Sequence, residues 1–264
     1  EVRQSVSDRP PIVCPLNEIN FMAWAVDEGY FPGVGADRRG WFKHHLLRTA
    51  ITAARAIRER WHAATIVWAE PLIHIAPHDR RRATVRAAEQ NLQGMYEAYD
   101  WLMGLAKPEL GGDPSLVDVV GWNFYPHNQW YHKGPTIPMG HHEYRPLADM
   151  LVEMAERYGK PMFLAETGAE GSGRPAWLHY VCDEVRDAQR RGARVEGICL
   201  YPVTAYPGWD NSRHCDVGLL STIGADGNRK VYEPLREEMD RQKAIFGLAQ
   251  AGDAQPTRLR VARP

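Results

Sequence analysis

The sequence predicts an α/β fold with a parallel sheet, and two observations lead to this prediction. Residues 160–168 read Lys-Pro-Met-Phe-Leu-Ala-Glu-Thr-Gly, a short apolar run between a Pro and a Gly, which is typical of a buried strand. Apolar residues recur at helical spacing on both sides of this run, over 147–155 and 177–185. Strands that alternate with amphipathic helices in this way build α/β sheets.

The same alternation extends along most of the chain. The predicted strands are 11–18, 64–71, 117–126, 160–168 and 195–202. The predicted helices are 41–61, 79–105, 147–155, 177–191 and 235–246. Within 79–105, Gly94 leaves open whether the segment is one long helix or a helix pair.

The remaining segments are predicted to connect these elements. Residues 72–75 extend or bulge the second strand. Residues 21–40 are rich in Gly and aromatic side chains and predict a long loop that walls the site, and 127–142 predict a second loop. The polar residues 1–10 belong to a helix tail or a loop.

Two of the predicted strands end on a glutamate. Glu166 lies at the end of the 160–168 strand, and Glu18 ends the segment Pro-Ile-Val-Cys-Pro-Leu-Asn-Glu at 11–18. Parallel sheets place their chemistry at the carboxyl ends of their strands, although a structural salt bridge would also use such a residue. Two carboxylates at one such edge are what glycoside hydrolysis requires.

These residues carry a resemblance to a known group of enzymes. Asn17-Glu18 resembles the Asn-Glu that ends the fourth strand in the clan of (β/α)8 retaining glycosidases, and residues 165–168 resemble the nucleophile segment that ends the seventh. The helix at 44–58 resembles the one after the acid/base strand in glycoside hydrolase family 1, the β-glucosidase family. The resemblance covers about residues 11–240.

The chain departs from the family pattern at both motifs. It reads Asn-Glu-Ile at 17–19 where the family has Asn-Glu-Pro, and Glu-Thr-Gly at 166–168 where the family has Glu-Asn-Gly. These departures bear on the sugar preference more than on the two-carboxylate mechanism.

The resemblance implies a (β/α)8 TIM barrel of which the chain holds strands four to eight, with strands one to three missing. Residues 1–248 then form the C-terminal part of a single barrel, and residues 249–264, which lack apolar periodicity, form a flexible tail. A self-sufficient open sheet of five strands is the alternative architecture.

The resemblance also implies a retaining β-glycosidase that acts on a β-glucoside-like substrate by double displacement. Glu18 is the expected acid/base and Glu166 the expected nucleophile. An anionic neighbour and partial burial would give Glu18 the raised pKa that a general acid needs. The alternative role for Glu18 is a capping carboxylate for the helix that follows it.

Six further residues are expected to bind the substrate. They are Asn17, Glu70, His74, Asn123, Tyr125 and Trp209. The resemblance gives Asn17 a contact with the sugar 2-hydroxyl, Tyr125 a hydrogen bond to the nucleophile and Trp209 a stacking platform. The alternatives are a turn Asn, a core aromatic residue and a loop-packing Trp.

Two of the remaining three binding residues are expected from their position on the second predicted strand and its extension. Glu70-Pro71 echoes Asn-Glu-Pro, so Glu70 either binds substrate hydroxyls or replaces Glu18 as acid/base. His74 either lines the cleft or is an ordinary strand-end histidine.

Composition narrows the other function classes. The chain of 264 residues is 44% hydrophobic and 25% charged with a net charge of −1, which indicates a globular protein without a nucleic-acid or membrane surface as partner. The sequence holds neither Gly-x-Ser-x-Gly nor His-Glu-x-x-His, which disfavours an unrelated hydrolase or metalloenzyme. A non-catalytic carbohydrate-binding barrel stays open as the alternative to a glycosidase.

No cofactor or metal is expected, because the pairs at 44–45 and 141–142 hold adjacent histidines that point apart on a helix. None of the four cysteines forms a Cys-x-x-Cys pair, and no signal peptide is visible. Free buried thiols in a reducing compartment therefore predict a cytoplasmic protein. The expected partner is a small-molecule glycoside, and the oligomeric state stays open.

Overall fold

The computed structural model describes residues 10–30, 39–208 and 212–248. The chain divides into two compact units, the first made of 1–169 and 183–201, the second of 170–182 and 202–264. Trp209 and the predicted tail at 249–264 lie outside the described residues.

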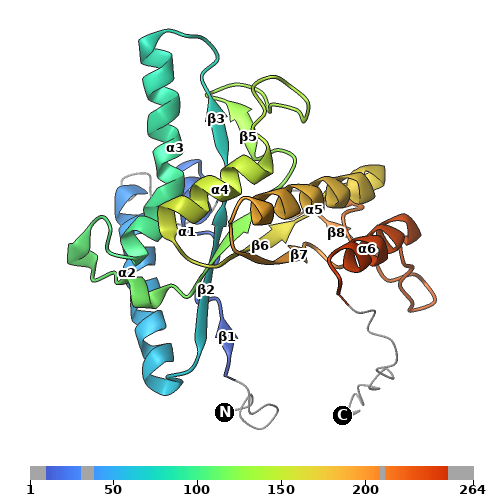
Figure 1. Ribbon diagram of the computed structural model, residues 1–264, viewed down its shortest axis with the longest axis horizontal. Helices are drawn as coiled ribbons and strands as arrows, with labels where there is room; N and C mark the ends of the chain where they lie inside the picture. Colours follow the sequence, from blue (N-terminus) through green and yellow to red (C-terminus); the bar gives the residue numbers. More distant parts are fainter. Residues whose placement is uncertain (1–9, 31–38, 209–211, 249–264) are drawn as a thin grey trace. The chain divides into compact units, whose positions relative to one another are not determined.

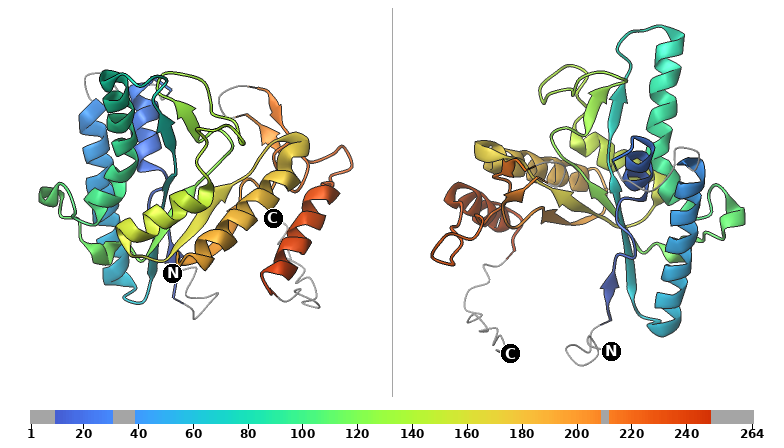
Figure 2. Two further views of the ribbon diagram at one scale, coloured as in Figure 1. Left: turned by 45° about the horizontal axis from the view of Figure 1, so that its top comes forward. Right: turned by 180° about the vertical axis from the view of Figure 1, so that it is seen from behind.

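A curled parallel sheet forms the centre of the first unit (Figures 1 and 2). Its strands are β1 (Ile12–Val13), β2 (Thr65–Pro71), β4 (Val119–Asn123), β6 (Met162–Thr167) and β7 (Val195–Leu200). They lie in the order β1-β2-β4-β6-β7, and every neighbouring pair is parallel. The five predicted strands are thus confirmed as neighbours, and their carboxyl ends share one edge of the sheet.

Helices follow the strands as predicted. They are α2 (Arg39–Arg60), α3 (Arg82–Leu102), α4 (Leu147–Tyr158), α5 (Arg174–Arg190) and α6 (Glu233–Ile245). Gly94 lies inside α3, so this segment is one helix and not a pair. Short 3-10 turns occupy η2 (Pro108–Leu110), η3 (Pro114–Leu116) and η4 (Gly171–Gly173).

The prediction of a loop at 21–40 is wrong over its first part, because the chain forms a helix there, α1 (Ile19–Asp27). Ile19, Ala23 and Val26 recur at helical spacing and are buried, so the apolar pattern is that of a helix face. Of the aromatic residues that favoured a loop, Trp24 is exposed on α1, and Tyr30 is exposed after the end of the helix. Residues 31–38 lie outside the described residues.

A second small sheet corrects two further predictions. The segment after Pro71 does not extend the main strand but forms β3 (His74–Ala76), which pairs in parallel with β5 (Gln129–Tyr131) inside the predicted 127–142 loop. The buried side chain of Asn128 donates to the carbonyls of Leu72 and Asn123, both at 3.0 Å, and so joins the starts of the two segments. In the second unit, β8 (Tyr206–Pro207) and β9 (His214–Cys215) pair antiparallel.

The main sheet has a helix-covered face and an open face. On β2, Ile66, Trp68 and Glu70 alternate with Val67 and Ala69. Helices α1 and α3 pack against β2 on the first of these faces (Figure 2). Trp68 lies there, and its indole N–H donates to the carbonyl oxygen of Leu116 at 2.8 Å. The aromatic core continues under the helices with Tyr99, Trp122 and Tyr158.

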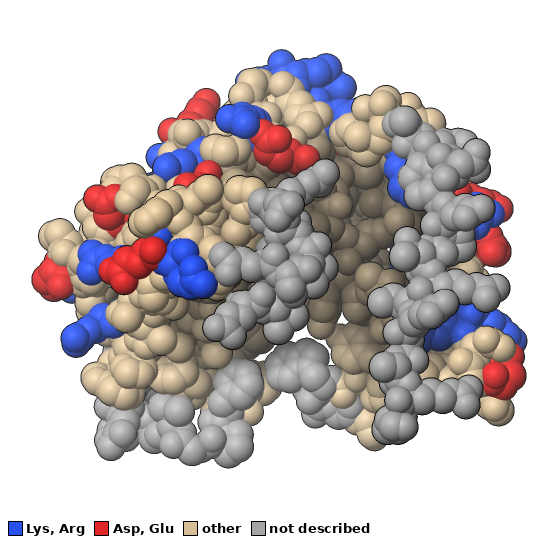
Figure 3. Space-filling view, turned by 90° about the horizontal axis from the view of Figure 1, so that it is seen from below, with Lys and Arg blue, Asp and Glu red and all other residues tan. Residues whose placement is uncertain are grey.

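Charged side chains of both signs are mixed on one face of the molecule (Figure 3). On the face drawn in Figure 3, Lys and Arg side chains are interspersed with Asp and Glu, so this face presents no broad area of one sign.

None of the helices in the described ranges is long and apolar enough to pass through a bilayer. All four cysteines are free thiols; Cys14 and Cys199, which lie in predicted buried strands, are exposed, whereas Cys182 and Cys215 are buried.

Two glycines give a matched test of this packing. A Cβ at Gly121 in β4 would lie 2.4 Å from the Trp68 carbonyl oxygen and 2.9 Å from the Phe163 ring, whereas one at Gly94 in α3 would meet nothing within 4 Å. We expect Gly121→Ala to lower the free energy of unfolding by about 1–3 kcal/mol, as overpacking does. Gly94→Ala should raise it by about 0.5–1 kcal/mol.

Urea unfolding of both variants beside the native chain measures these changes. Equal stability of the two alanine variants would contradict the close strand contact at Gly121.

Candidate active site

A β-bulge in β6 aims Glu166 at the open face of the sheet. Trp122 of β4 pairs with Leu164, and the next residue, Asn123, pairs with Glu166, so Ala165 is an extra residue in β6. Leu164 is fully buried on the helix side. Strict alternation would send Glu166 to that same side, and the extra residue returns it to the face of Phe163 and Ala165.

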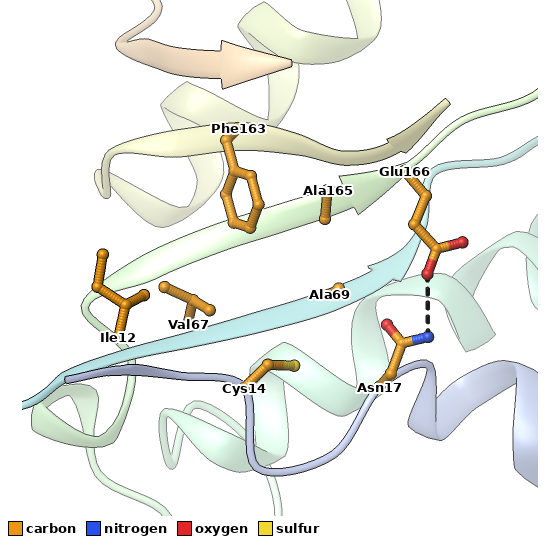
Figure 4. A pocket seen from close by; sticks show the side chains of 8 residues that line it. All are labelled: Ile12, Cys14, Asn17, Val67, Ala69, Phe163, Ala165 and Glu166. Atoms are coloured by element: carbon orange, nitrogen blue, oxygen red, sulfur yellow. Dashed lines mark hydrogen bonds between the residues drawn. The ribbon is translucent and has the colours of Figure 1, made fainter. Parts of the chain in front are cut away.

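That face carries a hollow of about 410 Å³. Its lining consists of Ile12, Cys14, Asn17, Val67, Ala69, Phe163, Ala165 and Glu166. Figure 4 shows the larger apolar side chains toward the amino ends of the strands and the polar pair, Asn17 and Glu166, at the carboxyl end. The hollow is therefore apolar at its base and polar at the strand-end edge.

Glu166 accepts one hydrogen bond on each carboxyl oxygen. The Asn17 side-chain amide donates to Oε1 at 3.2 Å, and the Tyr125 hydroxyl donates to Oε2 at 2.8 Å (Figure 4 shows the first). Burial and the charge of Glu166 raise the pKa of Tyr125 well above its usual value, which keeps the hydroxyl a donor. Two donors suit an ionised carboxylate of fixed orientation.

Glu18 lies beside this pair in an uncommon backbone conformation. Its φ of 52° and ψ of 56° are left-handed, and its N–H donates to the Ala69 carbonyl at 2.8 Å. The buried Asn123 amide donates to its Oε1 at 2.9 Å. Burial raises the pKa of Glu18 to about 7; the Asn123 hydrogen bond opposes this rise, and the charge of Glu166 adds to it.

Glu70 does not take the place expected for it. It alternates with Ala69 and so faces the helices, where its side chain is 1% exposed and accepts the backbone N–H groups of Ile19 at 2.7 Å and Asn20 at 2.9 Å. Burial raises the pKa of Glu70 to about 8, against these two hydrogen bonds. A carboxyl group enclosed in this way has no surface to offer a substrate hydroxyl. The prediction that Glu70 contacts the substrate is therefore wrong.

The structure thus brings together Asn17, Glu18, Asn123, Tyr125 and Glu166 at the strand ends. His74 lies on β3, outside this hydrogen-bond network. Its pKa is lowered by burial and by the charge of Arg145.

The sequence reasoning missed two thiols near Glu166. Cys14 lines the hollow, and Cys199 lies close enough to Glu166 for its charge, after burial, to raise the pKa of the thiol. Cys14 stands two residues after Ile12, so in an extended segment both side chains face the same side. This spacing is the signal that would have found Cys14. Within the described ranges, no three His, Cys, Asp or Glu side chains gather in a way that could hold a metal ion.

Solved structures supply the comparison with known proteins. A family 1 β-glucosidase from Thermotoga maritima matches with a TM-score of 0.67 and 18% identity over 88% of this chain and 63% of that one. A β-glucosidase from the same organism in complex with glucoimidazole gives a TM-score of 0.69 at 16% identity, with the same coverages of 88% and 63%. The fold is similar to that of family 1 β-glycosidases.

A third match, a β-glycosidase from Pyrococcus horikoshii, has a TM-score of 0.67 and 14% identity over 91% of this chain and 64% of that one. The chain spans 52–64% of the length of such structures. No protein-family model matches the sequence, and no curated protein matches it either.

The raised pKa of Glu18 makes stability depend on pH. Its folded pKa of about 7 lies above the ordinary 4.5, so the native state binds more protons than the unfolded state between these values, and stability falls as pH rises through that window. Glu18→Gln has no carboxyl group to titrate at this position, so it does not lose this stability as the pH rises. We expect the variant to gain about 1–3 kcal/mol over the native chain at pH 8 and little at pH 4.5.

Urea unfolding at both pH values measures the gain. Glu59→Gln, which changes an exposed carboxylate on α2, is the control and should show no such pH dependence. A gain at pH 4.5 equal to that at pH 8 would contradict the burial of Glu18 as a charged group.

Proposed function

We propose that this protein is a retaining β-glycosidase that hydrolyses a β-glucoside-like small molecule. One observation carries the proposal. Two glutamates meet at the carboxyl ends of one parallel sheet, and they differ in the way that the chemistry needs. Glu166 has a donor on each oxygen, whereas Glu18 has its pKa raised to about 7.

In the first step, Glu166 attacks the anomeric carbon through a carboxylate oxygen. The bond from that carbon to the glycosidic oxygen breaks, and Glu18 gives its proton to the departing oxygen. Asn17 and Tyr125 hold the attacking carboxylate in orientation. Asn17 and Asn123 supply amide groups at the same edge for sugar hydroxyls.

In the second step, Glu18 takes a proton from water, and the water oxygen attacks the anomeric carbon and releases Glu166. The charge of Glu166 raises the pKa of Glu18 in the free protein. Esterification of Glu166 removes that charge, so the pKa of Glu18 falls as its task changes from acid to base.

The same proposal covers the architecture. We propose that β1, β2, β4, β6 and β7 are strands four to eight of a (β/α)8 barrel and that residues 1–248 belong to this one barrel. The fold similarity to family 1 β-glycosidases supports it. Within the described residues β1 and β7 each have one neighbour in the main sheet, so three further strands would pair there and enclose the apolar hollow.

The two glutamates should fail in different ways. Glu166→Ala removes the nucleophile and should abolish turnover of every glycoside, with azide restoring activity and giving the inverted glycosyl azide. Glu18→Ala should lower kcat/KM for an alkyl β-glucoside by about 10²–10⁴, the usual contribution of general acid catalysis. It should spare kcat/KM for a dinitrophenyl β-glucoside, whose leaving group needs no proton.

Both variants are assayed on both substrates in the complete protein, with Glu59→Gln as control. Equal activity in the native protein and both alanine variants would overturn the assignment and favour a non-catalytic carbohydrate-binding barrel.

Asn123 offers a test by pH. Its hydrogen bond lowers the pKa of Glu18, so Asn123→Ala should raise that pKa. A protonated Glu18 then persists to higher pH, and the alkaline limb of kcat/KM should move up by roughly one pH unit or less. Asn91→Ala, which loses an amide contact to His132 instead, is the matched control. An alkaline limb that moves down would contradict Glu18 as the acid.

A further inference from the structure

The first turn of α1 has an unusual partner for its backbone N–H groups. A helix start leaves such groups without acceptors inside the helix, and the side chain of the N-cap residue usually serves them. Here the N-cap residue is Glu18, which makes no side-chain cap hydrogen bond, and the first turn holds no acidic residue. Glu70, from β2, accepts the N–H groups of Ile19 and Asn20 instead.

Because Glu70 accepts these N–H groups, the Glu18 side chain is available to the site. If Glu18 capped its own helix, its carboxyl group would turn back to the N–H groups of the first turn. With Glu70 in that place, the Glu18 carboxyl group instead meets the Asn123 amide at 2.9 Å. The alternative role of Glu18 as a capping residue is thus taken by another glutamate.

The backbone of Glu18 also needs external support. Left-handed φ and ψ values are disfavoured for a residue with a side chain, and they persist where the surroundings hold them. The N–H of Glu18 is held by the Ala69 carbonyl at 2.8 Å, and the next two N–H groups are held by the side chain of Glu70. Two consecutive residues of β2 therefore hold three consecutive N–H groups.

The carboxyl group of Glu70 is itself held in place. It is 1% exposed, between the sheet and the helices, so its carboxyl group cannot swing away to solvent. The positive charge of Lys43 on α2 favours its ionised form. Lys43 in turn pairs with Glu97 of α3, and its ammonium group lies 5.6 Å from the Trp101 ring centroid.

We propose that Glu70 is the positioning residue of the acid/base, which caps α1 in place of Glu18 and holds Glu18 in the left-handed conformation that aims its carboxyl group at the site. This role rests on the proposed function of Glu18. It depends on the N–H at position 19, which Ile19 supplies and which a proline would lack.

Two substitutions at Glu70 test the proposal. Glu70→Gln keeps the size but replaces one accepting oxygen by an NH₂ donor, and Glu70→Asp keeps the carboxyl group but is one methylene too short to reach both N–H groups. The matched control is Glu184→Gln, since Glu184 accepts the N–H of Ala148 in the first turn of α4 at 2.9 Å. Thermal melts establish that each variant is folded at the assay temperature.

The first readout is leaving-group selectivity in the complete protein. Both Glu70 variants should lose about 10–100-fold in kcat/KM for the alkyl β-glucoside, part of what general acid catalysis contributes. For the dinitrophenyl β-glucoside they should lose less than about 3-fold, because that step needs no proton. Glu184→Gln should leave both values unchanged. If the role of Glu70 were merely structural, kcat/KM would fall equally for both substrates, and that result would overturn the proposal. The selectivity of the native protein in Glu70→Asp would overturn it as well.

The second readout does not require activity. The carboxyl carbon of Glu18 is titrated by NMR in ¹³C-labelled native chain, Glu70→Gln and Glu184→Gln. Release of Glu18 from its buried place should move its pKa from about 7 toward 4.5 in Glu70→Gln alone. An unchanged value would refute the positioning role. If the native protein hydrolyses no glycoside, the proposed function fails, and this titration still decides whether Glu70 positions Glu18.

Discussion

The alternation of side chains along parallel strands is the constraint on which the rest of this structure depends. In β2, consecutive residues point to opposite faces, so Ala69 lines the hollow and Glu70 meets the helices. Parallel pairing brings the carboxyl ends of all five main strands to one edge. Polar residues placed there by sequence gather from segments more than a hundred residues apart, as Asn17 and Glu166 do.

The structure gathers three carboxyl groups near that edge and separates them by environment. Glu166 has two donors, Glu18 has one donor and is partly buried, and Glu70 is enclosed with two backbone donors. Burial of a charged group is costly unless hydrogen bonds replace water. The different numbers and kinds of donors therefore give three side chains of the same type different environments, which suit the acid, nucleophile and anchor roles proposed above.

The fold similarity extends over most of the chain at 14–18% identity. Such a fold tolerates wide substitution, because apolar strands and amphipathic helices of the right period are sufficient to build its layers. The site is less tolerant, since it depends on particular atoms. The Asn-Glu-Pro motif of family 1 has a proline after its glutamate, whereas this chain has Ile19, whose N–H donates to Glu70 at 2.7 Å.

The sequence by itself determined the elements whose signals are local. The run from Pro161 to Gly168 shows a strand in its own composition, and Glu166 stands near the Gly that ends it. Glu18 follows β1 (Ile12–Val13) and directly precedes α1. The helical spacing of apolar residues in α1 covers only nine residues, and a helix this short depends on packing and on a carboxylate 50 residues away.

Tertiary structure alone decided how the side chains are aimed. The extra residue at Ala165 exists only through pairing with β4, and it turns Glu166 to the open face. The direction of Glu70 follows from alternation once the faces of β2 are known, but which face the helices cover is settled by packing. Strand register and helix placement are contacts between distant segments, and no window of sequence contains both partners.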